Sequence, residues 1–169
     1  RYSGLAGDLG IGSGSDKGVA ATVAMRRGQW DDAKRLLAAQ KDLPEEFRPH
    51  VGEFVDAVAD PAKRPAVVAY FRAVDPQVAT QQELLQPYVQ LGQVDLAYGI
   101  LEQTLAQDRA GGPQYWDLMH LWGPESAPLR KDPRFSRLVE RVGLVDYWKQ
   151  YGYPDRCRPG TGTVAIVCA

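Results

Sequence analysis

Two segments of this chain repeat the same pattern of residue types 64 positions apart, and this repeat limits the choice of fold more than any other feature. The first reads RRGQWDDAKRLLAAQ and the second reads QLGQVDLAYGILEQT. The aligned pairs are Gly28 with Gly92, Trp30 with Val94, Ala33 with Ala97 and Leu37 with Leu101. Apolar residues recur at spacings of three and four, which is the pattern of packed helices. A glycine turn and a small alanine let two antiparallel helices pack closely. The sequence therefore predicts an all-α fold of helix pairs, the alternative being an ordinary bundle with accidental spacing.

A spacing of 64 residues is twice about 32, which leaves room for a third helix pair between the two clear copies. This middle pair, roughly residues 45–76, lacks the turn glycine and has Arg64 or Pro65 where a small alanine is expected. Helices are expected in PEEFRPHVGEFVDAVAD and PAKRPAVVAYFRAVD, and Pro87 predicts a kink or an early break in the helix before Gly92. Later helices are expected in PQYWDLMHLWG, DPRFSRLVERVG and LVDYWKQYG, and a strand only in TVAIVCA.

The repeat resembles a tetratricopeptide array, in which helix pairs of 34 residues stack into a solenoid. This resemblance implies a short right-handed solenoid with aromatic capping helices at its C-terminal end and a short tail. The expected organisation is a flexible Gly/Ser-rich lead-in over 1–18, about three degenerate helix pairs over 19–112, capping helices over 113–152, and a tail loop with two cysteines over 153–169.

The stretch APLRKDPRFSRLVERVGLVDYWKQYGYPDRCRP carries a second resemblance. Its motifs are Leu129-Arg130, Asp132-Pro133-Arg134-Phe135, Gly143-Leu144, Tyr147-Trp148, Pro154-Asp155 and Cys157-Arg158-Pro159. They resemble the closing segment of tetratricopeptide regions in bacterial membrane-anchored winged-helix transcription regulators and in adenylate cyclase-associated proteins. The side chains expected to cover the apolar face of the last helix pair are Phe135, Leu138, Val142, Leu144, Tyr147, Trp148 and Tyr151. The alternative for these aromatic residues is a ligand pocket.

The resemblance implies a non-catalytic interaction or sensory domain of a bacterial signalling or transcription regulator, which binds a protein, peptide or small signal through a helical groove. The positions that would line this partner-binding groove are Thr22, Met25, Arg26, Glu53, Asp56, Gln82, Gln86, Val89 and Gln90. An alternative is a cytosolic scaffold that packs against an upstream output domain such as a nucleotide cyclase. Formation of a homodimer is a further alternative, and membrane anchoring would come only from an upstream segment.

No residue pattern for catalysis or for a cofactor is visible, so we expect no enzyme, no cofactor and no metal. The Gly-rich segment RYSGLAGDLGIGSGSDKG lacks the Walker phosphate-loop pattern, since Lys17 follows Asp16 and Gly18 stands where Ser or Thr is needed. It also lacks the dinucleotide-binding pattern Gly-x-Gly-x-x-Gly. His50 and His120 lie far apart, without a cluster of ligand-type residues around either. The net charge of -1 gives no bulk attraction to nucleic acid.

Cys157 and Cys168 are the two cysteines of the chain and both lie in its tail. Two ligands are too few for zinc, and a redox pair favours the spacing Cys-x-x-Cys. Closure of this short Gly/Pro-rich segment by a disulfide is the preferred interpretation, and two free cytosolic thiols are the alternative. A disulfide would favour an oxidising compartment, so we expect a periplasmic location, with the cytoplasm as the alternative. The first residue is Arg1 rather than Met, so we expect either that an upstream part was cleaved or that the chain belongs to a longer protein.

Overall fold

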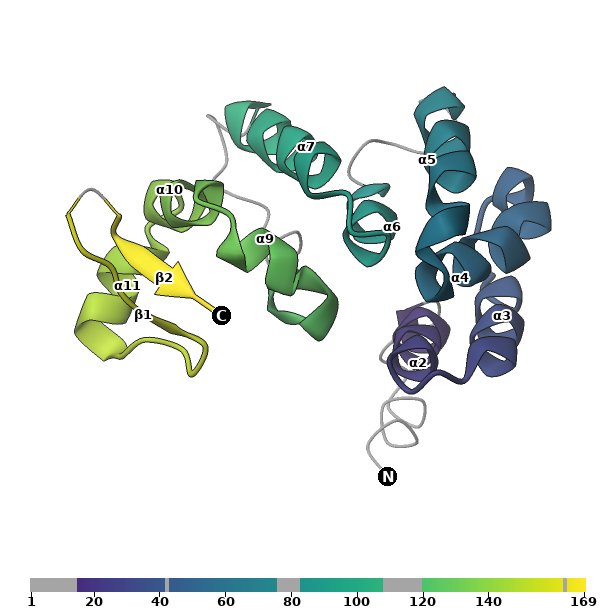
Figure 1. Cartoon of the computed structure of the whole chain (residues 1–169), viewed down its shortest axis with the longest axis horizontal. Helices are drawn as coiled ribbons and strands as arrows, with labels where there is room; N and C mark the ends of the chain where they lie inside the picture. The colour runs from purple at the N-terminus through teal and green to yellow at the C-terminus, as the bar shows by residue number, and fades with distance from the viewer. Residues whose placement is uncertain (1–14, 42, 76–82, 108–119, 163) are drawn as a thin grey trace. The chain divides into compact units, whose positions relative to one another are not determined.

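The computed structural model describes residues 15–41, 43–75, 83–107, 120–162 and 164–169 (Figure 1). The chain divides into two compact units, residues 1–79 and 80–169. Helices make up most of both units, and the strands among the described residues are two short ones near residue 169. The all-α prediction is confirmed at this level. Residues 1–14 of the lead-in predicted over 1–18, and most of the expected helix PQYWDLMHLWG, lie outside the described residues. Residues 15–18 are helical, so the flexible lead-in predicted there is wrong and the first described helix begins earlier than Val19.

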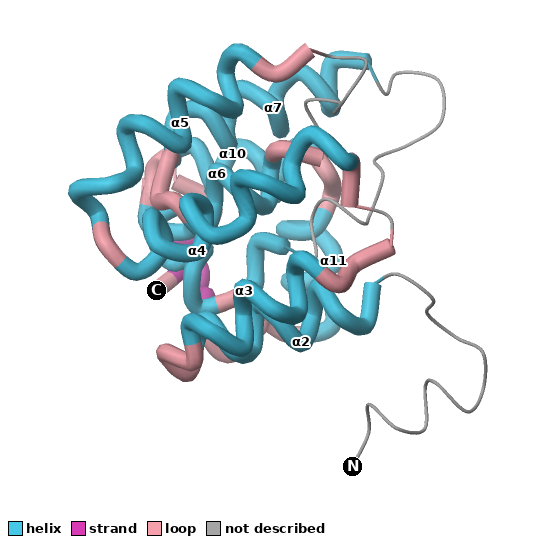
Figure 2. The backbone as a smooth tube through the Cα atoms, turned by 90° about the vertical axis from the view of Figure 1, so that its right-hand side faces the viewer, coloured by secondary structure: helices cyan, strands magenta, loops and turns pink. Residues whose placement is uncertain are grey.

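The N-terminal unit is a series of helices in which each packs against the next. Its elements are α2 (Ser15–Arg26), α3 (Trp30–Ala38), the 3-10 helix η1 (Glu45–His50), α4 (Val51–Ala59), the 3-10 helix η2 (Pro61–Lys63) and α5 (Arg64–Ala73). Helices α2 and α3 lie side by side, α3 also contacts α4, and α4 contacts α5 (Figures 1 and 2). The core of this unit gathers Ala24, Met25, Ala33 and Val55, against which Trp30, Leu36, Leu37, Phe54 and Val58 pack. Burial of these apolar faces holds the helices together.

The two aligned glycines form the same turn in the two units. Gly28 and Gly92 both have a φ of 70°, which is the left-handed region that glycine adopts most easily. The backbone amide of Gln29 donates to the carbonyl of Ala24 at 2.9 Å, and that of Gln93 donates to Tyr88 at 2.8 Å. The backbone amide of each glycine also donates to the carbonyl of the residue three positions earlier, at 3.0 Å. These paired bonds are the Schellman arrangement that ends a helix, so the predicted breaks at both glycines are confirmed.

The middle pair turns by other means, because it has no glycine. The helix expected over PEEFRPHVGEFVDAVAD is divided into η1 and α4, and Pro49 lies inside the 3-10 part. Asp60 ends α4, and its carboxylate accepts from the backbone amide of Ala62 at 3.0 Å, which caps η2. Arg64 then donates from Nε to the carbonyl of Ala57 at 3.1 Å. An arginine therefore binds the end of α4 at the position where a small alanine was expected.

The C-terminal unit contains α6 (Leu85–Gln90), α7 (Val94–Gln107), the 3-10 helices η3 (His120–Trp122) and η4 (Pro124–Ser126), α9 (Ala127–Lys131), α10 (Arg134–Arg141) and α11 (Leu144–Tyr151). Helix α6 begins at Leu85, so Pro87 occupies its first turn, where proline is tolerated. The early break predicted at Pro87 is therefore wrong, because α6 continues past this residue to Gln90. The expected helices over DPRFSRLVERVG and LVDYWKQYG are confirmed as α10 and α11.

The tail forms a two-stranded antiparallel sheet. Strand β1 (Cys157–Pro159) pairs with β2 (Ile166–Cys168), and Cys157 lies opposite Cys168. The strand predicted in TVAIVCA is confirmed, whereas β1 was not predicted. Its three residues include a proline, which is tolerated at the end of an edge strand but weakens the strand pattern in the sequence.

Candidate partner-binding site

The three predicted partner-binding residues of α2 differ in exposure. Met25 is 6% exposed and belongs to the core of the N-terminal unit, so it has little surface to offer a ligand. Thr22 is half-buried, and its hydroxyl donates to the carbonyl of Gly18 at 3.0 Å. Arg26 is exposed at the end of the helix. On this helix a partner would therefore meet Arg26 first.

Helix α4 carries the acidic candidates, Glu53 and Asp56. The Glu53 carboxylate lies 2.8 Å from Nδ1 of His50. The Asp56 carboxylate lies 2.7 Å from the ammonium of Lys34 and 3.3 Å from that of Lys63. The hydrogen bond from Lys34, followed by that from Lys63, lowers the pKa of Asp56. Asp56 therefore links α4 to α3 and to η2, while Glu53 keeps most of its surface open.

The remaining candidates belong to the C-terminal unit, except that Gln82 lies outside the described residues. Val89 is buried against its own unit. The Oε1 atom of Gln86 is buried and has no hydrogen-bond partner in the part of the chain that the structure describes. Gln90 is half-buried near the end of α6. Of the described candidates, Arg26 and Glu53 are exposed, Met25 and Val89 are buried, and the half-buried ones are Thr22, Asp56, Gln86 and Gln90.

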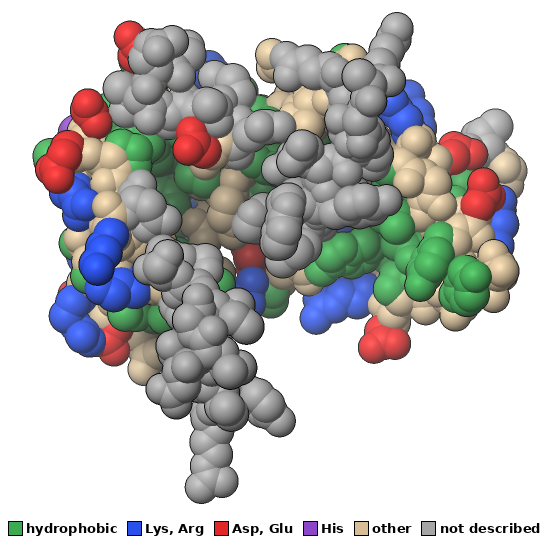
Figure 3. Space-filling view, turned by 180° about the vertical axis from the view of Figure 1, so that it is seen from behind, with side chains coloured by type: hydrophobic (Ala, Val, Ile, Leu, Met, Phe, Trp, Pro, Cys, Tyr) green, Lys and Arg blue, Asp and Glu red, His purple; other side chains and the backbone are tan. Residues whose placement is uncertain are grey.

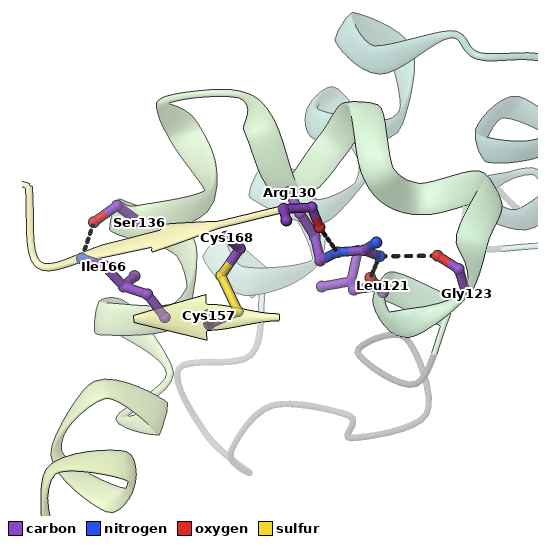
Figure 4. The surroundings of a disulfide bond; sticks show 8 residues. Leu121, Gly123, Arg130, Ser136, Cys157, Ile166 and Cys168 are labelled. Atoms are coloured by element: carbon purple, nitrogen blue, oxygen red, sulfur yellow. Dashed lines mark hydrogen bonds between the residues drawn. A yellow bond between two sulfur atoms is a disulfide. The ribbon is translucent and has the colours of Figure 1, made fainter. Parts of the chain in front are cut away.

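The C-terminal unit is closed by a disulfide between Cys157 and Cys168, as the sequence favoured (Figure 4). Beside it, Arg130 is 2% exposed and donates to three backbone carbonyls. The acceptors are Leu121 at 2.7 Å, Gly123 at 2.8 Å and Ala169 at 3.0 Å. Burial, and then the nearby charge of Arg156, lower the pKa of the Arg130 guanidinium. Figure 4 shows this side chain between β2 and the segment around η3, so it fastens the tail to the helices.

A second arginine of the same motif joins α7 to α10. Arg134 bonds the carboxylate of Asp132 at 2.8 Å and that of Asp95 at 2.7 Å, and its guanidinium lies 4.3 Å from the ring centroid of Tyr98. The hydrogen bond from Arg134 lowers the pKa of Asp132 to about 2. Burial raises the pKa of Tyr98, whose hydroxyl donates to the carbonyl of Leu129 at 2.8 Å. These contacts fix the position of the helices and leave Arg134 engaged within the unit.

The bulky residues expected in the cap differ in exposure. Phe135, Leu138 and Trp148 are buried, and Trp122 packs edge-on against Phe135 and Trp148 with centroids 6.0 and 5.8 Å away. Tyr147 and Tyr151 are exposed and contact each other on the outer face of α11. The buried group contributes to the core, while the two tyrosines do not shield it.

Among the described residues, no group of three or more His, Cys, Asp or Glu side chains is placed to hold a metal ion. Within the same ranges, no helix is long and apolar enough to cross a membrane. No family model, curated protein or solved structure matches this chain. The tetratricopeptide and regulator resemblances therefore stay predictions that rest on the residues quoted above.

Proposed function

We propose that this chain is a non-catalytic interaction or sensory domain of a bacterial signalling or transcription regulator, built as a short tetratricopeptide-like stack. The observation that supports this proposal most directly is the common turn at Gly28 and Gly92. Each turn is followed five residues later by a fully buried alanine, Ala33 or Ala97. Repeated helix pairs of this kind present extended surfaces for partners.

The solvent-facing residues among the predicted positions indicate a polar mode of recognition. Arg26 and Glu53 are exposed, and Gln90 is half-buried. Charged and amide side chains at such positions would select a partner by charge and hydrogen bonding rather than by apolar contact alone. The buried Met25 and Val89 would then support the backbone beneath these residues instead of contacting the partner.

The disulfide supports a location outside the cytoplasm. Disulfides form and persist in oxidising compartments, and in bacteria this points to the periplasm or beyond. We therefore propose that the domain works on the periplasmic side of the membrane. Alkylation of native protein with and without reductant tests this: thiols that react only after reduction support the proposal, and thiols that react at once contradict it.

Site-specific photocrosslinking in the native host tests the function. A photoreactive residue at position 26 or 53, both in the N-terminal unit, should give adducts of one common mass, because these positions would contact the same partner. Matched positions 27 and 103 carry an exposed arginine and an exposed glutamine that are not among the predicted partner-binding residues, and they should give none. Adducts from both sets alike, or from neither set, would refute a partner-binding surface at these residues.

A further inference from the structure

Five aromatic rings from three elements of the N-terminal unit pack together, and we call them the aromatic cluster. They are Phe47 and His50 of η1, Phe54 of α4, and Tyr70 and Phe71 of α5. Phe71 is buried at the centre, with ring centroids of Phe47 and Phe54 both 5.9 Å away and that of Tyr70 at 5.6 Å. The other four rings are half-buried, so the cluster extends from the core to the surface.

His50 and Tyr70 form the most closely stacked pair of the cluster. Their centroids lie 4.1 Å apart with an interplanar angle of 34°. The Tyr70 hydroxyl donates to the backbone carbonyl of Glu46 at 3.1 Å, and Nδ1 of His50 lies 2.8 Å from the Glu53 carboxylate. Both rings are therefore held in place by groups from neighbouring elements, and a ligand would meet a pre-arranged surface.

Two carboxylates beside this pair are not matched by a cation. Glu46 is exposed, the Glu53 side chain is 67% exposed, and no lysine or arginine in the described ranges forms an ion pair with either. Burial, followed by the charges of Glu46 and Glu53, raises the pKa of Tyr70. Glu45, by contrast, is paired with Arg48 at 3.1 Å. Figure 3 shows acidic side chains near a histidine at one edge of the face in view.

We propose that His50, Tyr70, Glu46 and Glu53 form a surface that binds an arginine side chain of a partner peptide. A guanidinium is planar, so it can stack on an aromatic face while its edge donates paired hydrogen bonds to a carboxylate. An ammonium is a compact, strongly hydrated charge and lacks this geometry. The inference rests on the proposed function as an interaction domain, because Glu53 is also a predicted partner-binding residue, and it names the chemistry of one contact.

Titration of the full chain with short peptides, followed by NMR, tests this surface. The probes are N-acetyl-Gly-Arg-Gly amide, its lysine analogue, and its citrulline analogue, which keeps the shape of arginine without its charge. The arginine peptide should give saturable shifts at the rings of His50 and Tyr70, the lysine peptide should bind about fivefold more weakly, and the citrulline peptide should not saturate. Equal binding of the arginine and lysine peptides, or shifts that map elsewhere, would overturn the proposal.

Substitutions distinguish the contribution of the carboxylates to peptide binding from that of the rings. Glu46→Gln combined with Glu53→Gln should weaken the binding of the arginine peptide about tenfold, since each removes a charge at an exposed position. Glu45→Gln is the matched control, because that carboxylate is already paired with Arg48, and it should leave binding unchanged. Tyr70→Phe keeps the ring and should keep binding, whereas Tyr70→Leu should lose it. An unaltered affinity in the double glutamine variant would refute the arginine surface.

The peptide experiment and the crosslinking experiment can refute the two proposals separately. Crosslinks at positions 26 and 53 without arginine binding would refute this surface and leave the proposed function intact. Arginine binding without those crosslinks would uphold the surface and refute the proposed arrangement of partner contacts.

Discussion

Replacement of both cysteines by alanine should loosen the tail of the C-terminal unit by an amount that follows from the loop it closes. Cys157 and Cys168 are 11 residues apart, and the chain-entropy treatment of such a loop gives about 3 kcal/mol. Alanine is the right replacement because the cysteines are only 9% and 7% exposed, so serine would bury two hydroxyls as well. The contacts of Arg130 with Ala169 and of Ser136 with Ile166 would remain, and the tail should stay docked but open more often.

Hydrogen exchange read by mass spectrometry measures this opening segment by segment. A loss of about 3 kcal/mol corresponds to roughly a hundredfold faster exchange of the amides in residues 157–168. Residues 15–41, which belong to the other unit, should exchange at the original rate and serve as an internal control. Wild-type protein under reducing conditions should match the double alanine variant. Equal exchange of the tail in the oxidised wild type and in the variant would show that packing alone holds it, and that the loop argument is wrong.

Two further substitutions are tested by urea unfolding and a third by hydrogen exchange. Arg134 lowers the pKa of Asp132 from 3.8 to about 2. The stabilisation of the folded state by this pair is therefore complete above about pH 4 and is lost as the pH falls through about 2. Asp132→Asn should therefore cost about 1–2 kcal/mol at pH 7 after allowance for partial solvent exposure, and midpoints measured from pH 6 to pH 2 should fall less steeply than in wild type; parallel profiles would contradict this. Gly28→Ala should cost about 1–2 kcal/mol, because its φ is 70° although an added Cβ meets no atom, and an unchanged midpoint would refute a required left-handed turn. Gly160→Ala should disrupt the tail, since a Cβ there would overlap the carbonyl oxygen of Val164, and normal exchange protection of residues 157–168 would refute that.

The features that the sequence predicted correctly depend on short stretches of chain. The turns at Gly28 and Gly92 need only a left-handed residue and two helix-forming flanks, and both can be recognised within fifteen residues. The disulfide joins cysteines that share one short tail. Pro49 was visible too, but its effect of turning the first part of a helix into a 3-10 segment depends on how η1 packs, which periodicity does not report.

The features that the sequence missed depend on contacts between distant residues. Arg130 bonds Ala169, and Arg134 bonds Asp95, and each pair is separated by 39 positions. Nothing in the local pattern distinguishes these buried or engaged arginines from solvated ones, because an arginine on a short helix is most often exposed. The exposed position of Tyr147 and Tyr151 was missed for the same reason, since helical spacing gives their common face but not whether that face is covered.

The residues that carry the resemblance to bacterial regulators therefore explain how this unit is closed rather than what it binds. Arg130, Asp132, Arg134 and Cys157 all make contacts inside the C-terminal unit. Contacts of this kind can be shared by domains with different partners, because they satisfy groups within the unit itself. Selectivity must then come from side chains that face solvent with their charge unmatched. In the described part of the chain, Glu46 and Glu53 beside the stacked rings fit that description, which is why the arginine peptide is the most informative probe of partner choice.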